Sequence, residues 1–141
     1  MLFKSDRIAA EWADPLLNQK LKSIVTAAAE RALQRWDWEF FITCIHRTPE
    51  ENDALYGGRG DHLTGVHVVW RGVDVRTRGV DPSAVLDITT NVNDSWLYDS
   101  AREGMLVALP EGGKDFGSSG AHLHFQVSPV TIERVDTLVT A

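Results

Sequence analysis

The sequence holds a single cysteine, Cys44, among its 141 residues. One thiol excludes an intramolecular disulfide framework and any metal site built from several cysteines. Long apolar runs are also missing, since no stretch approaches the roughly 18 apolar residues of a membrane span. The N-terminal segment carries Asp6, Glu11 and Asp14 where a signal peptide needs an apolar core. We therefore expect a soluble protein with no signal peptide and no membrane partner.

Basic charge is scarce as well. The chain has 14 lysines and arginines against 20 acidic residues, a net charge of -6 at pH 7. Proteins that bind nucleic acid without sequence preference need a basic field to displace counterions, so we expect no nucleic-acid partner. With 43% apolar and 24% charged side chains, the composition is that of one globular domain spanning residues 1–141.

Glycine and histidine are missing from the N-terminal part. The first 56 residues contain no glycine, all 11 glycines lie between Gly57 and Gly120, and all 5 histidines lie at or after His46. Glycine is needed where the backbone turns sharply or approaches another group closely. We expect residues 1–37 to form a helical scaffold, residues 38–128 to hold a metal-binding core, and residues 129–141 to form a C-terminal tail.

Local patterns predict an α+β fold. Good helix formers between Ser5 and Trp36 predict one short and one long helix, with a break at Pro15 and Asp14 as the N-cap of the second helix. The other predicted elements are a buried strand over 38–45, a helix over 49–56, a strand over 72–77, a helix beginning near residue 82, and strands over 105–109 and 121–127. Together they indicate a small, mainly antiparallel sheet with flanking helices.

The strand predicted over 121–127 alternates strictly between apolar and polar residues. One face holds Ala121, Leu123, Phe125 and Val127, and the other holds His122, His124 and Gln126. The apolar face would fix the strand over a core, because a slip by one residue exchanges the faces. The two imidazoles would lie about 6 to 7 Å apart at the backbone. That spacing suits two metal ligands or one ligand beside a polar group, and it also suits an exposed pair.

A second pattern brings in His67 and Asp74, seven positions apart. An extended chain would separate them by more than about 20 Å and a helix by about 10 Å, so both reach one ion only if the chain folds back. Gly65 and Gly72 bracket the stretch and allow such a fold-back. With His124 they would give two nitrogens and one oxygen, as in a catalytic zinc site. The alternative is a loop-capping aspartate beside a buried, hydrogen-bonded histidine.

Three segments in this order resemble the LAS group of zinc peptidases. They are the run from Arg47-Thr48-Pro49 to Leu55-Tyr56, then His67-x6-Asp74, then His122-Leu123-His124-Phe125-Gln126-Val127. The group takes in lysostaphin-type enzymes, D-alanyl-D-alanine carboxypeptidases and Hedgehog domains. The sequence is most similar to small phage-encoded proteins of the carboxypeptidase-like branch, over roughly residues 40–128.

The resemblance implies a zinc site on the sheet face. Its ligands would be His67, Asp74 and His124. Arg47 matches an arginine that lies beside the metal and stabilises an oxyanion, a role that suits a fixed cation. The alternative for Arg47 is a surface salt bridge to an acid of the following helix.

The sequence departs from the group at two positions. The group usually has a serine two residues before the first ligand, and here that residue is Gly65. Carboxypeptidases of this group have an acidic general base three residues before the last ligand, and here that residue is Ala121. His122 instead matches the first histidine of the lysostaphin-type pair, so we expect it to act as base or transition-state stabiliser. Asp115 could replace the missing acid or be an exposed loop residue. His62 and His46 could enter the cleft or lie outside it.

We therefore expect a zinc-dependent peptidase that hydrolyses D,D or L,D amide bonds in peptidoglycan peptides. It would be made in the bacterial cytoplasm and act at the cell wall after release, or as part of a virion. The alternative is a non-catalytic zinc domain that serves as a virion or assembly component. We assign no chemistry to Gln126, and we expect Cys44 to be a buried, inert thiol.

Overall fold

The computed structural model describes residues 1–56, 65–112 and 120–134, in which the predicted α+β class is confirmed. In chain order the elements of this part are β1 (Leu2–Phe3), α1 (Asp6–Ala13), α2 (Gln19–Trp36), β2 (Phe41–Cys44), α3 (Pro49–Tyr56), β3 (Gly72–Arg76), α4 (Pro82–Ser95), β4 (Trp96–Leu97), β5 (Ala108–Glu111), β6 (His122–Gln126) and β7 (Ile132–Glu133).

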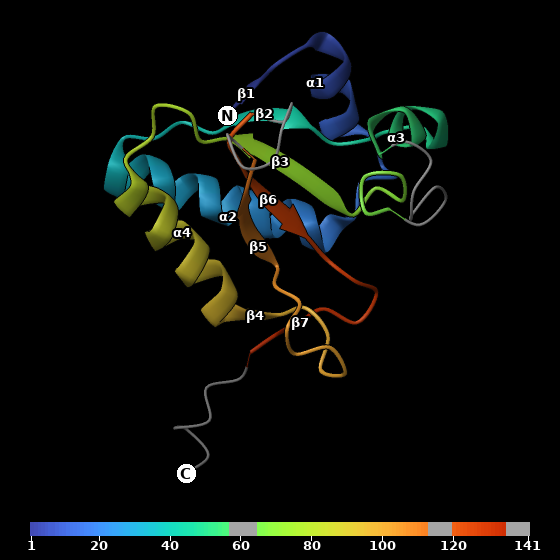
Figure 1. Ribbon diagram of the computed structural model, residues 1–141. Coiled ribbons are helices and arrows are strands. Elements are labelled where there is room, and N and C mark those ends of the chain that lie inside the picture. Colours follow the sequence, from blue (N-terminus) through green and yellow to red (C-terminus); the bar gives the residue numbers. More distant parts are fainter. Residues whose placement is uncertain (57–64, 113–119, 135–141) are drawn as a thin grey trace.

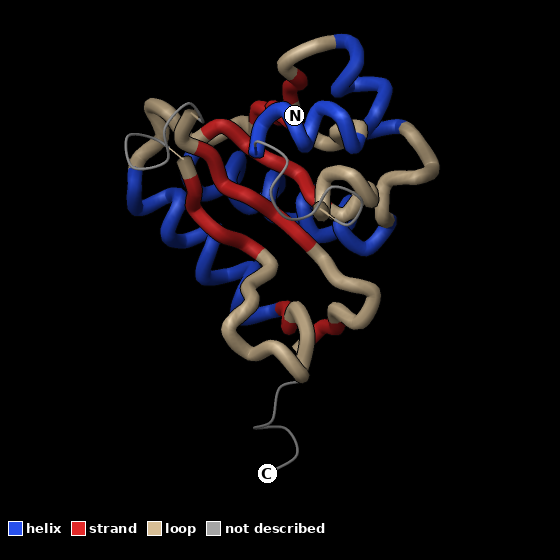
Figure 2. Tube along the Cα trace, turned by 45° about the vertical axis from the view of Figure 1, so that its right-hand side comes forward, coloured by secondary structure: helices blue, strands red, loops and turns tan. Residues whose placement is uncertain are grey.

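The main sheet has five strands in the order β1-β2-β3-β6-β5, and β1 and β2 are its one parallel pair. Helices α2 and α4 lie along one face of this sheet (Figure 1). The tube in Figure 2 shows both helices behind the long central strands. In the segment predicted as a tail, β7 pairs with β4 to form a separate two-stranded sheet.

The core lies between the sheet and α2 and α4. Val73 and Val75 of β3 and Leu123 and Phe125 of β6 are fully buried on this side. Burying a side chain of this size stabilises the fold by about 1.5 to 3 kcal/mol. Because side chains alternate along a strand, the polar residues of β3 and β6 point to the opposite face, as the alternation over 121–127 predicts. The candidate site is built on that opposite face.

The two predicted N-terminal helices are present, but the prediction that Asp14 caps the second helix is wrong. Asp14 ends α1, and its carboxylate accepts a hydrogen bond from the backbone N–H of Leu16, 2.8 Å away. Asn18 caps α2 instead, with its Oδ1 3.0 Å from the backbone nitrogen of Leu21. Because the Asp14 carboxylate bonds the turn between the helices, it does not cap α2, which begins at Gln19.

The strand predicted over 105–109 lies further along the chain, at Ala108–Glu111. Asn93 of α4 explains the start of this strand. Its Oδ1 accepts from the backbone nitrogens of Val107 and Ala108, at 3.1 and 2.9 Å. The shift includes Glu111 in the strand and places it opposite His122 in the sheet.

Candidate metal centre

The carboxylate of Asp74 lies at the centre of the polar face of the sheet. Its Oδ1 is 2.7 Å from Nδ1 of His124 and 3.3 Å from Nε2 of His67. Its Oδ2 is 3.8 Å from Nε2 of His122 and 3.9 Å from Nη2 of Arg47. The five residues singled out in the sequence thus meet at one carboxylate. His67, Asp74 and His124 are each buried, with 5 or 6% of their surface exposed.

Strand register places three of these residues. In the antiparallel pair β3–β6, Asp74 is opposite His124 and Arg76 is opposite His122. Directly opposed residues project to the same side of a sheet, close enough to interact. The buried Leu123, which alternates with the two histidines, makes a slipped register costly because it would bring these polar groups into the core.

His67 reaches the site from a turn over residues 65–71, which provides the fold-back that the spacing requires. The backbone nitrogen of Val69 bonds the carbonyl oxygen of Gly65 at 3.1 Å, and Trp70 adopts a left-handed conformation with φ 61°. A Cβ at Gly72 would lie 3.2 Å from the His67 ring. Glycine at this position therefore lets the turn pack its histidine against β3.

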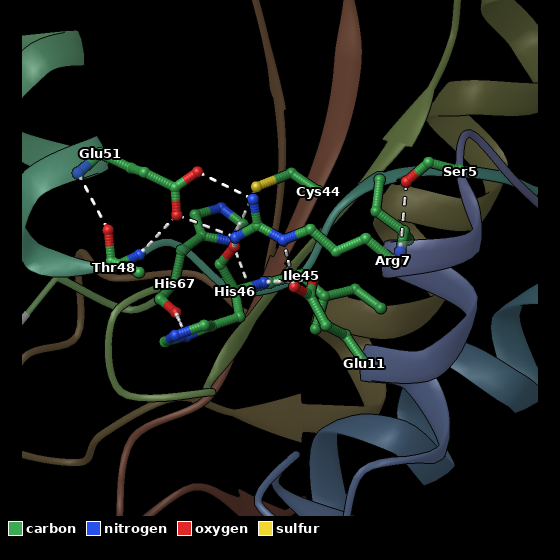
Figure 3. A network of polar contacts seen from close by, with 10 residues as sticks. Ser5, Arg7, Glu11, Cys44, Ile45, His46, Thr48, Glu51 and His67 are labelled. Carbon is green, nitrogen blue, oxygen red and sulfur yellow. Dashed lines mark hydrogen bonds and ion pairs between the residues drawn. The ribbon is translucent and has the colours of Figure 1, made fainter.

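The orientation of the His67 ring follows from its second nitrogen. Nδ1 lies 2.9 Å from the carbonyl oxygen of Ile45, to which it donates (Figure 3). That bond leaves Nε2 as the nitrogen that faces Asp74. Histidines that bind metals are commonly held in this way, by a donor bond from the other ring nitrogen.

The backbone of His67 is held by the end of β2 as well. Its carbonyl oxygen lies 3.3 Å from the backbone nitrogen of Arg47 and 3.1 Å from Nδ1 of His46, and both donate to it. The His46 ring also stacks on Trp70, with centroids 4.2 Å apart and planes 8° from parallel. His46 thus supports the turn rather than joining the groups around Asp74.

His124 is held in a similar way, but with the roles of its two ring nitrogens exchanged. Its Nε2 lies 3.1 Å from Oε1 of Gln126, and the amide nitrogen of Gln126 donates to the carbonyl oxygen of Leu106 at 2.8 Å. The second bond makes Oε1 the atom that faces the ring, so Nε2 donates and Nδ1 faces Asp74. Sequence reasoning gave Gln126 no role, although its position two residues after His124 on the same strand face was a usable signal.

Two of the three predicted ligands, His67 and Asp74, are spaced as metal ligands are. When Nδ1 of His67 and Nε2 of His124 act as donors, the remaining ring nitrogens are acceptors that both face a carboxylate oxygen. Acceptors that converge in this way need a proton or a cation between them. A tetrahedral zinc site with bonds of about 2.0 to 2.1 Å places its ligand atoms about 3.3 Å apart, which is the separation of His67 Nε2 and Asp74 Oδ1 here. Asp74 Oδ1 and His124 Nδ1 are instead at the hydrogen-bond distance of 2.7 Å, so a bound zinc would move them apart.

Cys44 also lies beside the site. Cys44, His67 and Asp74 could hold a metal ion, because one ligand atom from each lies within 4.8 Å of the others. The β2–β3 pairing shifts between Ile42 and Cys44, so that Cys44 is opposite Asp74. A regular ladder would not give this register. The thiol is half-buried, and its sulfur is 3.6 Å from Nδ1 of His67, a contact that the strand pattern did not indicate.

Charge coupling between Asp74 and His67 is strong. Burial, the largest influence on each pKa, acts against the charged forms. The charge of Asp74, together with the hydrogen bonds that His67 makes with Asp74 and Cys44, outweighs burial and raises the pKa of His67 well above its usual value. The charge of His67 and the hydrogen bond from His124 lower the pKa of Asp74 well below its usual value. In the metal-free protein Asp74 is therefore a carboxylate and His67 is an imidazolium whose Nε2 donates to it, so a metal ion would take the place of that proton.

His122 has a different partner. Its Nε2 lies 3.4 Å from Oε1 of Glu111, and its Nδ1 donates to the carbonyl oxygen of Gly120 at 2.8 Å. The bond to Glu111 raises the pKa of His122 to about 9, opposed by burial and aided by Asp74, and His122 in turn lowers the pKa of Glu111. At neutral pH His122 is therefore an imidazolium paired with a carboxylate.

Arg47 lies beside Asp74, and Glu51 of the following helix α3 has a different arginine as its partner. Glu51 pairs with Arg7 at 2.8 Å and closes a capping box with Thr48 at the start of α3 (Figure 3). The hydrogen bond from Arg7, followed by that from the backbone of Thr48, lowers the pKa of Glu51 to about 2. These contacts tie α1 and α3 to the segment that carries Arg47, whose side chain is 19% exposed.

Two sequence candidates, His62 and Asp115, lie outside the described residues. None of the helices in the described part of the chain is long and apolar enough to cross a membrane. The chain matches no protein-family model, and comparisons with curated proteins and with solved structures gave no match either.

Proposed function

We propose that this protein is a zinc-dependent peptidase that cleaves amide bonds in peptidoglycan peptides. The observation that carries the proposal is that His67 Nε2 and His124 Nδ1 both approach the same oxygen of Asp74, at 3.3 and 2.7 Å. The opposite nitrogens of both rings are engaged by Ile45 and Gln126. Three protein ligands of this kind leave a coordination position open, as catalytic zinc sites do.

Zinc bound by these residues would supply a Lewis acid that polarises an amide carbonyl and lowers the pKa of water toward neutrality. Arg47, on the other side of the Asp74 carboxylate, would stabilise the negative charge that develops on the carbonyl oxygen. Its fixed charge needs no proton transfer to do so.

His122 and Glu111 supply the proton chemistry in this proposal. The sequence lacks an acid at Ala121, and Glu111 brings a carboxylate to the same face from the neighbouring strand. Glu111 would accept the proton from the attacking water, and the His122 imidazolium would donate one to the departing amine. This assigns His122 the part of acid and stabiliser rather than that of the base.

The substrate class is supported by the resemblance of the motifs around Arg47, His67 and His122 to LAS peptidases. Stem peptides or cross-bridges of peptidoglycan would be cleaved at D,D or L,D bonds, after release of the protein to the cell wall or from within a virion. A metal site that only stabilises the fold is the competing function, and it needs neither Glu111 nor His122.

The test is mass spectrometry of muropeptides incubated with the zinc-loaded protein. We expect pairs of fragments whose summed mass exceeds that of the parent muropeptide by one water, as hydrolysis of one amide bond requires. The variant His122→Ala should retain zinc and lose about 100-fold or more in kcat. Arg102→Ala, which removes an arginine paired with Asp99, should match the natural protein. A zinc-loaded protein that leaves every muropeptide intact, yet melts at a much lower temperature after chelation, would establish the structural role instead.

A further inference from the structure

A cavity of about 340 Å³ opens beside the candidate metal centre, with Asp74 and His122 in its wall. Four basic side chains line it, namely Lys4, Arg47, Arg76 and Arg78. Asp74 is the one acid among the lining residues that the structure describes. This concentration of positive charge stands out in a chain with a net charge of -6.

The sheet topology gathers these cations from distant parts of the sequence. β1 runs parallel to β2, and the backbone nitrogen of Lys4 donates to the carbonyl oxygen of Ile42 at 2.9 Å. β3 runs antiparallel to β2, so its last residue, Arg76, returns to the start of β2 and lies over the ring of Phe41 at 4.2 Å. The N-terminal segment, expected to be only scaffold, thus contributes Lys4 to the cavity.

Two of the cations are available to a ligand. Lys4 and Arg78 are both exposed. Within the described ranges no carboxylate lies within ion-pair distance of either side chain. Cations that line one concave surface reinforce each other's field and attract an anionic ligand. Guanidinium groups in particular match the two oxygens of a carboxylate.

We propose that this cavity binds a carboxylate of the substrate, so that the protein selects peptides with a carboxylate close to the bond that is cleaved. The inference rests on the proposed function for the position of that bond. Because Asp74 and His122 belong to the same cavity wall, an anion held by Lys4 and Arg78 places the adjoining amide near the metal ligands. The carboxylate can be the C-terminus of the peptide or the side chain of an acidic residue.

Calorimetric titration of the zinc-loaded full chain separates these sources. One pair of probes is acetyl-D-alanyl-D-alanine and its C-terminal amide, and the other is acetyl-alanyl-glutamate amide and acetyl-alanyl-glutamine amide. In at least one pair, we expect the carboxylate peptide to bind about tenfold more tightly than its neutral partner. Preference within the first pair identifies a peptide terminus, and preference within the second identifies an acidic side chain. Equal affinity within both pairs would overturn the inference.

Variants test whether the cavity is responsible for the preference for a carboxylate over an amide. The double variant Lys4→Ala/Arg78→Ala should reduce the tenfold preference to about twofold, since each exposed ion pair is worth up to about fivefold. Arg102→Ala removes an exposed arginine that pairs with Asp99 and does not line the cavity, so it should leave the preference unchanged. Unchanged discrimination in the double variant would contradict the assignment.

The outcomes also separate this inference from the proposed function. If the protein prefers the carboxylate peptides but cleaves no peptide, the anion site is supported and the proposed peptidase activity is wrong. Cleavage of carboxylate and amide peptides with the same KM would retain the peptidase and refute the anion site. If both hold, the double variant should raise KM for the acidic substrate and change kcat little.

Discussion

Asp74 and His124 face each other across β3 and β6, with the carboxylate Oδ1 2.7 Å from the imidazole Nδ1. The same oxygen lies 3.3 Å from Nε2 of His67, which arrives from the turn before β3. One buried carboxylate therefore meets two imidazoles whose other nitrogens are already bonded. The predictions below depend on this relationship and on the groups that hold it in place.

Gln126 should control metal affinity without touching the metal. The variant Gln126→Leu removes the acceptor for Nε2 of His124 and should weaken zinc binding about 10- to 100-fold, as loss of such a partner typically does. Gln126→Glu keeps an acceptor and should stay close to the natural affinity. A competition titration with a chromogenic chelator measures both. Equal affinity in all three proteins would mean that Gln126 does not orient His124.

Cys44 should lie outside the ligand set. Its sulfur approaches Nδ1 of His67, whereas the nitrogen that faces Asp74 is Nε2. Cys44→Ser should therefore change zinc affinity less than about tenfold. The cobalt-substituted natural protein should show no thiolate-to-metal charge-transfer band in its near-ultraviolet spectrum. An intense band that disappears in Cys44→Ser would establish Cys44, His67 and Asp74 as the ligands instead.

Glu111 should control the protonation of His122. In the metal-free protein we expect His122 to titrate with a pKa of about 9. Glu111→Gln removes the largest cause of that increase and should lower the pKa toward the ordinary value for histidine. Proton NMR of the ring signals measures both values. A pKa that is the same in the two proteins would contradict the pairing of Glu111 with His122.

The ion pair between Arg31 of α2 and Asp87 of α4 predicts that the free energy of unfolding decreases at acidic pH. Asp87 accepts from Arg31 at 2.9 Å and from Nε1 of Trp36 at 3.0 Å, and the bond from Arg31, followed by that from Trp36, lowers its pKa from 3.8 to about 2. Its folded pKa lies below the unfolded value, so its stabilising effect is complete above about pH 4 and is lost as the pH falls through 2.

Denaturant unfolding between pH 5 and 2 tests this dependence. Asp87→Asn should be less stable than the natural protein at pH 5, and the two should converge toward pH 2. Glu30→Gln, an exposed change on α2, is the matched control. A constant difference between natural protein and Asp87→Asn over this range would show that the carboxylate charge is not responsible.

Much of the site follows from local patterns in the sequence. Alternation over 121–127 correctly separates a buried face with Leu123 and Phe125 from a polar face with His122 and His124. The pattern suffices because strand periodicity decides which side chains share a face. The fold-back that brings His67 to Asp74 likewise follows from their spacing and from the glycine at position 72.

The rest depends on pairings that no local pattern contains. Cys44 reaches Asp74 through a register shift in β2, and Glu111 reaches His122 because Asn93 sets where β5 begins. Lys4 joins the cavity through a two-residue strand, β1, whose partner lies almost 40 residues away in β2. Such contacts are fixed by tertiary hydrogen bonds, so they become visible only in the folded structure.

Zinc stoichiometry and affinity test the metal centre most directly. Plasma mass spectrometry should find one zinc per chain in the natural protein after loading and dialysis. Asp74→Ala should lower the affinity by more than about 100-fold with an unchanged circular dichroism spectrum, since loss of a ligand exceeds the loss of its supporting groups. Asp87→Asn, an acid removed elsewhere, should still bind one zinc. A natural protein that takes up no zinc, or an Asp74→Ala variant that binds it equally well, would contradict the account.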